Sequence, residues 1–378
     1  MARDGNRITQ LRLVDFRNYS SLTLDVESRF IVLAGDNGSG KTNLLEAVSL
    51  LTPGRGLRRA TYPEMANLTG SGGFSVRAGV LDEQADSVDV LTMMRPDTAS
   101  GPQRQVRIDG TNARSADELL ALVRLLWLTP AMDGLFTGPA GDRRRFLDRL
   151  VLTLHPEHGR HATDYERAMR SRNRLLAEDR RDESWLSAIE SQMAETGLAI
   201  ALARAETVHR LKAAVCEGFG AGAGFPIAGL ELASGYGPVD LSRAAVDVED
   251  EVAGRLRSNR PLDRAAGRTL EGPHRSDLLV TYLAKSMPAA LASTGEQKAL
   301  LIGLILAHAE LVLATSGIPP ILLLDEVAAH LDAGRRAALF DILDHLGVQS
   351  FMTGTDYALF STLEGRAQIL SIANGSLT

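Results

Sequence analysis

Cysteine and lysine are both scarce in this chain of 378 residues. The single cysteine, Cys216, cannot form an intrachain disulfide, which excludes a secreted fold stapled by disulfides. Only four of the 41 basic residues are lysines, so the chain is rich in arginine. The 47 acidic residues outnumber the basic ones, and the net charge of −6 excludes a uniformly basic protein that coats nucleic acid. A single basic face stays compatible with this balance.

Long hydrophobic runs and a leader-like start are also missing. The first residues contain no apolar segment followed by a small-residue cleavage site, so we expect no signal peptide. The longest apolar stretch, residues 299–314, is interrupted by His308 and Glu310 and is too short to span a bilayer. We therefore expect a cytoplasmic protein without a membrane partner.

Apolar runs predict strands towards both ends of the chain. Alternation with period two is typical of a half-buried strand, and a continuous apolar run is typical of a strand buried on both faces. The predicted strands are residues 8–13, 20–26, 30–34, 74–81, 87–94, 104–108, 269–284, 321–324, 348–353 and 367–372. The runs between 74 and 108 indicate a small antiparallel sheet. Strands that alternate with helices at both ends predict a largely parallel sheet that the two ends share.

The middle of the chain has helical spacing instead. The predicted helices are residues 41–51, 142–154, 161–179, 183–217, 297–314 and 332–346, with another after Asp240. A further helix is expected from a cap at Ser115 through Leu125 and Leu126, because Glu118 stands at the capping-box position. The chain is therefore predicted to divide into residues 1–125, an inserted and mainly helical lobe at 126–265, and residues 266–378.

One glycine-rich turn carries a phosphate-binding pattern. Residues 35–42 match G-x-x-x-x-G-K-[ST], between a predicted strand and a predicted helix as this loop requires. Glycines let successive backbone N–H groups turn towards an anion, and the helix dipole adds to the attraction. Lys41 is expected to reach the β- and γ-phosphates of ATP, and the Thr42 hydroxyl to bind Mg²⁺. The predicted nucleotide-binding residues are Gly35, Asp36, Asn37, Gly38, Ser39, Gly40, Lys41 and Thr42.

Two carboxylates end a buried strand further along the chain. The run 321–324 is followed by Asp325 and Glu326, which is the pattern of a Walker B element. Because α/β sheets bind ligands at the carboxyl ends of their strands, we expect Asp325 to hold Mg²⁺ through its water shell. Glu326 is the predicted catalytic residue, which orients or deprotonates the attacking water. An acidic turn after an apolar strand is common by itself, so this interpretation depends on the phosphate loop upstream.

A short polar turn precedes the next apolar helix. By itself this turn indicates only a capped helix start. Its residues are Ser293, Thr294, Gly295, Glu296 and Gln297. Upstream of a Walker B strand, the turn resembles the signature loop of ATP-binding-cassette ATPases, whose helix N-terminus meets the γ-phosphate of ATP bound to a second subunit. The same resemblance places Asp332 in a D-loop at that dimer interface.

The separation of the two ATP motifs narrows the family. Lys41 and Asp325 lie 284 residues apart, far more than in the compact cassette of a transporter subunit. A gap filled by helices resembles the SMC-related DNA-repair branch of these ATPases, and within that branch the RecF family of bacterial recombination mediators. The stretches that carry the resemblance are residues 11–19, 35–42, 141–148, 272–277 and 293–298.

This resemblance implies more than the residues establish alone. It implies an α/β P-loop ATPase of the ATP-binding-cassette type, with a mixed sheet, an antiparallel subsheet and an inserted helical lobe. It also implies an ATP-dependent homodimer on double-stranded and gapped DNA, weak DNA-dependent and Mg²⁺-dependent ATP hydrolysis, and a role in recombinational repair and replication-gap processing. RecO and RecR are the implied partners in loading recombinase.

Two positions depart from the pattern of cassette ATPases. The strand after Walker B ends in Thr353, Gly354 and Thr355 where a switch histidine is usual. The γ-phosphate sensor is therefore predicted to be a threonine or to be missing. Residues 129–133 occupy the place of the Q-loop glutamine, and we assign no residue there.

Clusters of arginine are candidate contacts for DNA phosphates, which require several cations on one face. The predicted contacts are Arg55, Arg58 and Arg59, and further clusters lie at residues 143–145, 170–174 and 180–181. Solvated helix faces are the commoner explanation for any one cluster in an arginine-rich chain.

His274, in a tight loop, is interpreted as a structural hydrogen-bonding group and not as a catalytic one.

Two other functions stay open on the sequence alone. A transport-type ATPase subunit would carry the same ATP motifs, and co-purification with membrane would favour it. A nucleotide-gated structural clamp that does not hydrolyse ATP would carry them too. The clamp predicts that Glu326→Gln scarcely alters function.

Overall fold

The structure is a computed structural model that describes residues 6–82, 84, 86–96, 103–178, 182–218, 224–373 and 375–377. The chain divides into two compact units. The first unit consists of Met1–Gly134, Ala214–Ile227 and Ala292–Thr378, and the second consists of Leu135–Ala213 and Ala228–Leu291. Each unit is built from segments that are far apart in the sequence, as expected for a domain interrupted by an insertion.

The first unit contains the predicted antiparallel sheet. Its order is β2-β1-β4-β5-β6-β7, and every neighbouring pair is antiparallel. The strands are β1 (Arg7–Phe16), β2 (Tyr19–Asp25), β4 (Phe74–Leu81), β5 (Ser87–Met94), β6 (Arg104–Ile108) and β7 (Thr111–Asn112). Burial alternates along β1, because one face of this sheet covers the core and the other meets solvent.

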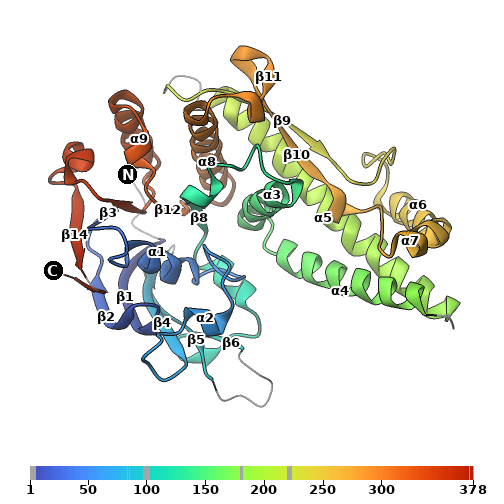
Figure 1. Ribbon diagram of the computed structural model, residues 1–378, viewed down its shortest axis with the longest axis horizontal. Coiled ribbons are helices and arrows are strands. Elements are labelled where there is room, and N and C mark those ends of the chain that lie inside the picture. Colours follow the sequence, from blue (N-terminus) through green and yellow to red (C-terminus); the bar gives the residue numbers. More distant parts are fainter. Residues whose placement is uncertain are drawn as a thin grey trace. The chain divides into compact units, whose positions relative to one another are not determined.

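A second sheet of this unit joins the two ends of the chain. Its order is β15-β14-β3-β13-β12-β8, with parallel pairs throughout except the antiparallel pair of β14 and β15. The strands are β3 (Phe30–Ala34), β8 (Leu125–Leu128), β12 (Ile321–Leu324), β13 (Ser350–Gly354), β14 (Ala367–Ala373) and β15 (Ser376–Leu377). Blue β3 therefore pairs with β13 and with red β14 (Figure 1). The prediction that both ends share one mixed sheet is confirmed.

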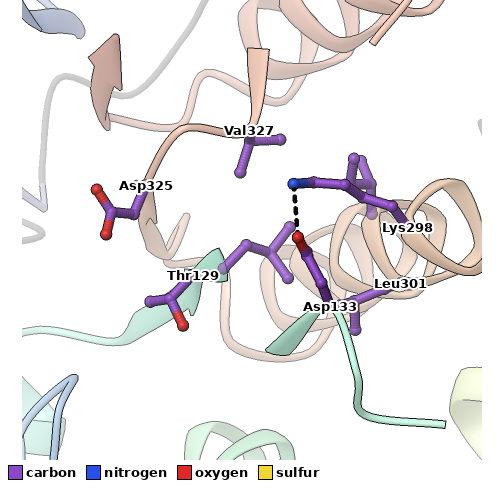
Figure 2. A pocket seen from close by; sticks show the side chains of 8 residues that line it. Thr129, Asp133, Lys298, Leu301, Asp325 and Val327 are labelled. Carbon is purple, nitrogen blue, oxygen red and sulfur yellow. Dashed lines mark hydrogen bonds and ion pairs between the residues drawn. The ribbon is translucent and has the colours of Figure 1, made fainter. Parts of the chain in front are cut away.

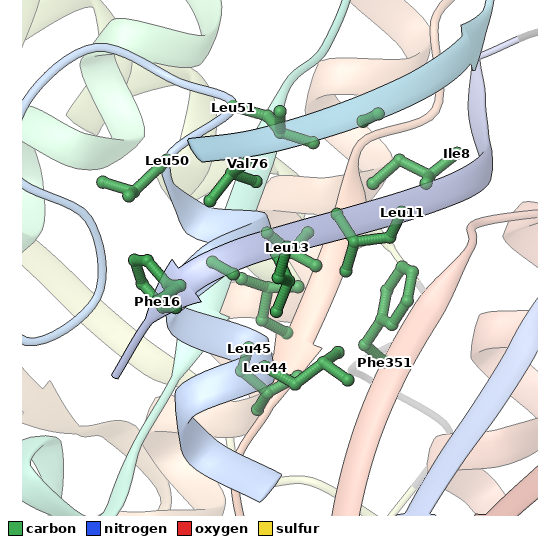
Figure 3. Packing of buried hydrophobic residues seen from close by; sticks show 14 of the residues in the cluster. Ile8, Leu11, Leu13, Phe16, Leu44, Leu45, Leu50, Leu51, Val76 and Phe351 are labelled. Atoms are coloured by element: carbon green, nitrogen blue, oxygen red, sulfur yellow. The ribbon is translucent and has the colours of Figure 1, made fainter. Parts of the chain in front are cut away.

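Helix α1 (Lys41–Ser49) packs against β1 of the antiparallel sheet and against β13 of the second sheet. Figure 3 shows the buried cluster in which Leu44 and Leu45 of α1 meet Leu13 of β1 and Phe351 of β13. These side chains are fully buried, so the phosphate-loop helix is held on both sides by apolar packing. The remaining helices of this unit are α2 (Tyr62–Met65), α8 (Thr294–Ser316) and α9 (Ala333–Leu346).

Helix α8 is apolar around most of its circumference. It begins three residues before the predicted helix 297–314 and has 23 residues. By length and composition it could cross a membrane, although the apolar stretch 299–314 inside it is too short by itself. It is the one such helix in the described part of the chain, and 72% of its most apolar window is buried. That burial is typical of the central helix of a packed core.

The second unit is mainly helical and has a small sheet of its own. Its helices are α3 (Ala140–Leu154), α4 (His158–Ala177), α5 (Glu183–Glu217), α6 (Ala245–Ser258) and α7 (Arg260–Ala266), although α5 ends inside the first unit. The strands β9 (Ala228–Ala233), β10 (Asp277–Tyr282) and β11 (Met287–Pro288) form an antiparallel sheet in the order β11-β10-β9. The unit begins nine residues after the predicted start at 126 and extends past the predicted end at 265 to residue 291, because β10 pairs with β9 and packs on α3.

One predicted helix is a strand. Ser115 does cap a turn, and its hydroxyl accepts a hydrogen bond from the Asp117 N–H, but that turn is a short 3-10 helix over Ala116–Ala121. Leu125–Leu128 then forms β8, which pairs in parallel with β12. A four-residue apolar run fits a buried strand as well as a helix. It becomes a strand here because it pairs with β12 at the edge of the sheet.

One arginine from each of two predicted clusters serves the interior of the second unit. Arg172 is fully buried and bonds the Glu190 and Asp263 carboxylates at 3.0 and 2.6 Å. Arg143 pairs with Asp277 through two 2.8 Å bonds. Buried cations require such partners, so these side chains are structural and are not available to DNA. Residues 180–181 lie outside the described residues.

Candidate functional site

The predicted phosphate loop lies between β3 and α1, as the motif requires. Gly38 and Gly40 have φ angles of 83° and 121°, which side chains with a Cβ atom rarely adopt. Lys41 is 4% exposed, and its ammonium donates to the carbonyls of Gly35 and Asp36 at 2.6 and 2.8 Å. The loop therefore presents the start of α1 and one buried lysine at the carboxyl end of β3, where an anion binds favourably.

The hairpin between β1 and β2 holds this loop through two hydrogen bonds. The Asn18 amide donates to the Ser39 carbonyl at 3.0 Å, and the buried Tyr19 hydroxyl donates to the Gly40 carbonyl at 3.0 Å. A Cβ on Gly40 would lie 2.6 Å from the Asn18 amide nitrogen, so only glycine fits there. Sequence reasoning used residues 11–19 as a family resemblance and missed this support, because its partners are about 20 residues away.

A buried carboxylate on α1 organises the segment after the phosphate loop. Glu46 is fully buried and accepts two bonds from Arg17 at 2.7 and 2.8 Å and one from Arg58 at 3.2 Å. Arg58 also bonds Asn43. Arg58 was predicted as a DNA contact, and its guanidinium is committed largely to α1, although 41% of the side chain stays exposed.

The Walker B strand delivers its carboxylate to the phosphate loop. In the parallel register, Leu324 of β12 is level with Met352 of β13, and Gly354 of β13 is level with Ala34 of β3. Asp325 follows directly and is 4% exposed, and its Oδ1 accepts a 3.0 Å bond from the Thr42 hydroxyl. Burial raises the pKa of the Asp325 carboxyl, and the hydrogen bonds from Thr353 and Thr42 oppose that shift.

The pair formed by Thr42 and Asp325 fits a magnesium ion. A hydroxyl and a carboxylate oxygen are the hard ligands that Mg²⁺ prefers, and such an ion keeps several waters and takes its other ligands from phosphate. No group of three or more His, Cys, Asp or Glu residues in the described ranges is arranged to hold a metal by itself. The donor set therefore matches a metal that arrives with a nucleotide.

The predicted signature turn begins α8. The Ser293 hydroxyl accepts a bond from the Glu296 N–H, and the Glu296 carboxylate accepts from the Ser293 N–H, which completes a capping box. Ser293, Thr294 and Gly295 are exposed. Gln297 instead turns inward, and its amide donates to the Ala292 carbonyl at 2.8 Å. The exposed tip thus consists of three small residues at the positive end of a 23-residue helix.

The segment in the place of the Q-loop contacts this helix. Figure 2 shows the Lys298 ammonium of α8 pointing to Asp133, and Lys298 Nζ lies 3.2 Å from Asp133 Oδ2. A small pocket beside this ion pair is lined by Thr129, Asp325 and Val327 among others. The ion pair joins α8 to the residues that follow β8, next to Walker B.

The D-loop candidate Asp332 caps α9 by accepting from the Arg335 N–H at 2.9 Å.

His274 has the structural role that the sequence predicts. Its Nε2 bonds the Thr269 carbonyl at 3.0 Å, and its Nδ1 bonds the Tyr165 hydroxyl at 2.9 Å. Burial lowers the pKa of His274, which favours the neutral ring inside these two bonds. Both ring nitrogens are thus occupied within the helical unit.

Comparisons with known proteins agree over the whole chain. The family model described as "RecF/RecN/SMC N terminal domain" matches residues 7–376. The "DNA replication and repair protein RecF" of Mesorhizobium japonicum is 57% identical over 370 residues, covering 98% of this chain and 97% of the relative. The protein of the same name from Rhizobium rhizogenes is 57% identical over 372 residues and 98% of each chain. A solved structure of the recombination mediator protein RecF with ATP, from the RecFOR pathway, is 22% identical, with a TM-score of 0.86 over 100% of this chain and 98% of that chain.

The likeness to the solved structure shows the fold, whereas the family model and the two relatives show common descent. A family model that spans nearly the full chain and relatives with 57% identity leave one assignment. This chain belongs to the RecF family of DNA replication and repair proteins, within the RecF/RecN/SMC group of ATPases.

Proposed function

We propose that this chain is an ATP-dependent DNA-binding dimer of recombinational repair, in which slow ATP hydrolysis releases the DNA. The observation that carries the proposal is the convergence of two motifs 283 residues apart, where the Thr42 hydroxyl bonds the Asp325 carboxylate at 3.0 Å. Membership of the RecF family removes the alternative of a transport-type subunit. The proposal distinguishes a hydrolysing switch from a clamp that binds nucleotide without hydrolysis.

The residues of one protomer each have a definite task in this proposal. The backbone N–H groups of residues 38–42 bind phosphate oxygens, and Lys41 exchanges its two carbonyl partners for the β- and γ-phosphates. Thr42 and Asp325 would hold Mg²⁺, which would neutralise phosphate charge when it is bound. The Glu326 carboxylate orients the attacking water and accepts its proton. Lys41 and Asp325 are both buried, so their charges act with little screening by water.

The partner protomer supplies the other side of the nucleotide. Ser293, Thr294 and Gly295 are exposed at a helix N-terminus and make the kind of surface that an anion prefers. Asp332 is also exposed, at the start of α9. In a two-fold dimer each signature tip would face the phosphate loop of its mate, so two ATP molecules would be shared.

Nucleotide-dependent association is the direct test of this arrangement. We expect the protein to sediment as a monomer without nucleotide or with ADP, and as a dimer with ATP and Mg²⁺. The γ-phosphate makes the difference, because it is the group that the partner's signature tip would bind. Analytical ultracentrifugation with and without gapped duplex measures both states. An unchanged sedimentation coefficient at saturating ATP would contradict the dimer.

The proposed partners rest on what the names of the relatives indicate. The relatives are DNA replication and repair proteins, and the similar solved structure belongs to the RecFOR pathway. We propose double-stranded and gapped DNA as ligands, and RecO and RecR as the proteins that cooperate with this chain in loading recombinase.

The DNA contact is proposed for the segment after α1. Arg55 and Arg59 are exposed there, and Arg104 of β6 supports the segment by donating to the carbonyls of Thr52 and Gly54 at 2.8 and 3.1 Å. A segment fixed in this way can present cations to a phosphate backbone with little loss of conformational entropy.

Reversing both exposed charges tests this placement. The double variant Arg55→Glu/Arg59→Glu should bind DNA at least about tenfold more weakly, because fewer phosphates are neutralised. Each lost phosphate contact also lowers the magnitude of the slope of log K against log salt by roughly 0.9. Since both arginines are replaced in each protomer, the slope should fall by about 3–4 in a dimer. A salt-titrated mobility-shift assay with ATP measures both quantities. The matched control Arg12→Glu/Arg114→Glu changes the net charge equally on exposed residues of the antiparallel-sheet region. Equal effects in both double variants would contradict the placement.

A further inference from the structure

One buried hydroxyl connects the two acidic residues of Walker B. Thr353 is the fourth residue of β13 and is 1% exposed. Its Oγ1 donates to Asp325 Oδ1 at 2.8 Å and accepts from the Glu326 backbone N–H at 2.8 Å. A threonine hydroxyl has one proton, and that proton is committed to Asp325.

The sheet order explains why Thr353 reaches both residues. Strand β13 lies between β3 and β12, and Thr353 is level with Leu33 of β3. The carboxyl end of β13 therefore separates the phosphate loop from Walker B. Asp325 Oδ1 is held from two sides, by Thr42 at the start of α1 and by Thr353 from β13.

The backbone of Glu326 depends on the same hydroxyl. Glu326 has a φ angle of 55°, in the left-handed region that residues with a side chain rarely occupy. Such a conformation persists only where its surroundings hold it, and the bond from its N–H to Thr353 is one such restraint. This backbone conformation sets the direction of the Cα–Cβ bond from which the Glu326 side chain extends.

We propose that Thr353 is a positioning residue for ATP hydrolysis, whose hydroxyl fixes the Asp325 carboxylate and the backbone of Glu326 in one arrangement. The inference rests on the proposed ATPase function. It assigns this hydroxyl to the Walker B pair and not to the γ-phosphate sensor that cassette ATPases usually carry at this strand end. In this role Thr353 acts through its two bonded neighbours, Asp325 and Glu326.

Replacement of Thr353 by valine removes the hydroxyl and keeps the branched shape, and replacement by serine keeps the hydroxyl. For Thr353→Val we expect kcat for ATP hydrolysis to fall at least about tenfold, because a misplaced general base forfeits much of its roughly 10²–10⁴-fold contribution. KM for ATP and ATP-driven dimerisation should stay within about threefold, since Lys41 and the phosphate loop are unchanged. Thr353→Ser should restore kcat to within about threefold of the wild type.

The controls distinguish a role of Thr353 in hydrolysis from a folding defect and from a failure of the proposed ATPase function. Thr153→Val removes a buried hydroxyl from α3 and should keep the wild-type kcat. If Thr353→Val does not fold, Thr353→Ala provides the same loss with less bulk. A wild-type kcat in the valine variant, an equal loss in the serine variant, or a loss of ATP binding in place of turnover would each overturn the role of Thr353. A wild-type protein that binds ATP without hydrolysing it would overturn the ATPase itself.

Discussion

Replacing Lys41 with methionine is expected to weaken ATP binding by at least about 100-fold and to abolish ATP-driven dimerisation. The ammonium is buried at the mouth of the phosphate loop, where its charge acts with little screening by water. Methionine keeps the apolar stem of the side chain, so the packing of α1 on Leu13 and Phe351 should survive. Isothermal titration with ATP and sedimentation with ATP measure the two losses.

An exposed lysine provides the matched control for this loss of charge. Lys285 lies in a hairpin of the helical unit, and Lys285→Met should leave ATP affinity unchanged. The melting temperature of Lys41→Met should stay near that of the wild type, because the variant loses two hydrogen bonds to loop carbonyls and also removes a buried charge. An ATP affinity within threefold of the wild type would contradict the phosphate-loop assignment.

Glu326→Gln is expected to reduce ATP hydrolysis by roughly 10²–10⁴-fold while ATP binding persists. Glutamine has the shape of glutamate and keeps the backbone N–H that bonds Thr353, but its amide does not accept a proton from water. The variant should therefore remain an ATP-bound dimer and stay on gapped DNA long after the wild type has dissociated. Single-turnover hydrolysis and DNA dissociation after competitor addition measure both effects.

This variant also separates the switch from the clamp that does not hydrolyse ATP. The clamp requires equal DNA dissociation from the wild type and from Glu326→Gln. Glu364→Gln changes an exposed glutamate of the same unit and should behave as the wild type in both assays. Fast release of DNA by Glu326→Gln would therefore support the clamp and exclude hydrolysis as the releasing step.

Short-range patterns made the nucleotide site predictable. The phosphate loop, the buried strand before Asp325 and the cap at Ser293 are each encoded within eight or fewer consecutive residues. The sharing of one sheet by both chain ends also follows from sequence, because strands that alternate with helices favour a largely parallel sheet. The bounds of β12 agree with the predicted run 321–324.

The remainder depends on partners that are distant in the sequence. Leu125–Leu128 reads equally as helix or strand until β12 is known to lie beside it. The sequence alone does not distinguish Arg58 and Arg172 from solvated arginines. Only their bonds to the buried carboxylates of Glu46 and Glu190 show that both guanidinium groups have structural partners. The sequence indicates at this strand end only a threonine sensor or none, and the role proposed for Thr353 rests on its bonds to Asp325 and Glu326 in the fold.

The central position of β3 has a consequence for biosynthesis. Its two neighbours, β13 and β14, come from the last 29 residues of the chain, and 315 residues separate the end of β3 from the start of β13. At about 5–20 residues per second, a ribosome needs roughly 15–60 s to synthesise that interval. During this time β3 is a fully apolar strand with both edges unpaired, which is the kind of segment that associates with other chains. The nascent protein therefore has to be shielded, by a chaperone or by transient contacts within the chain, until its carboxyl-terminal part leaves the ribosome.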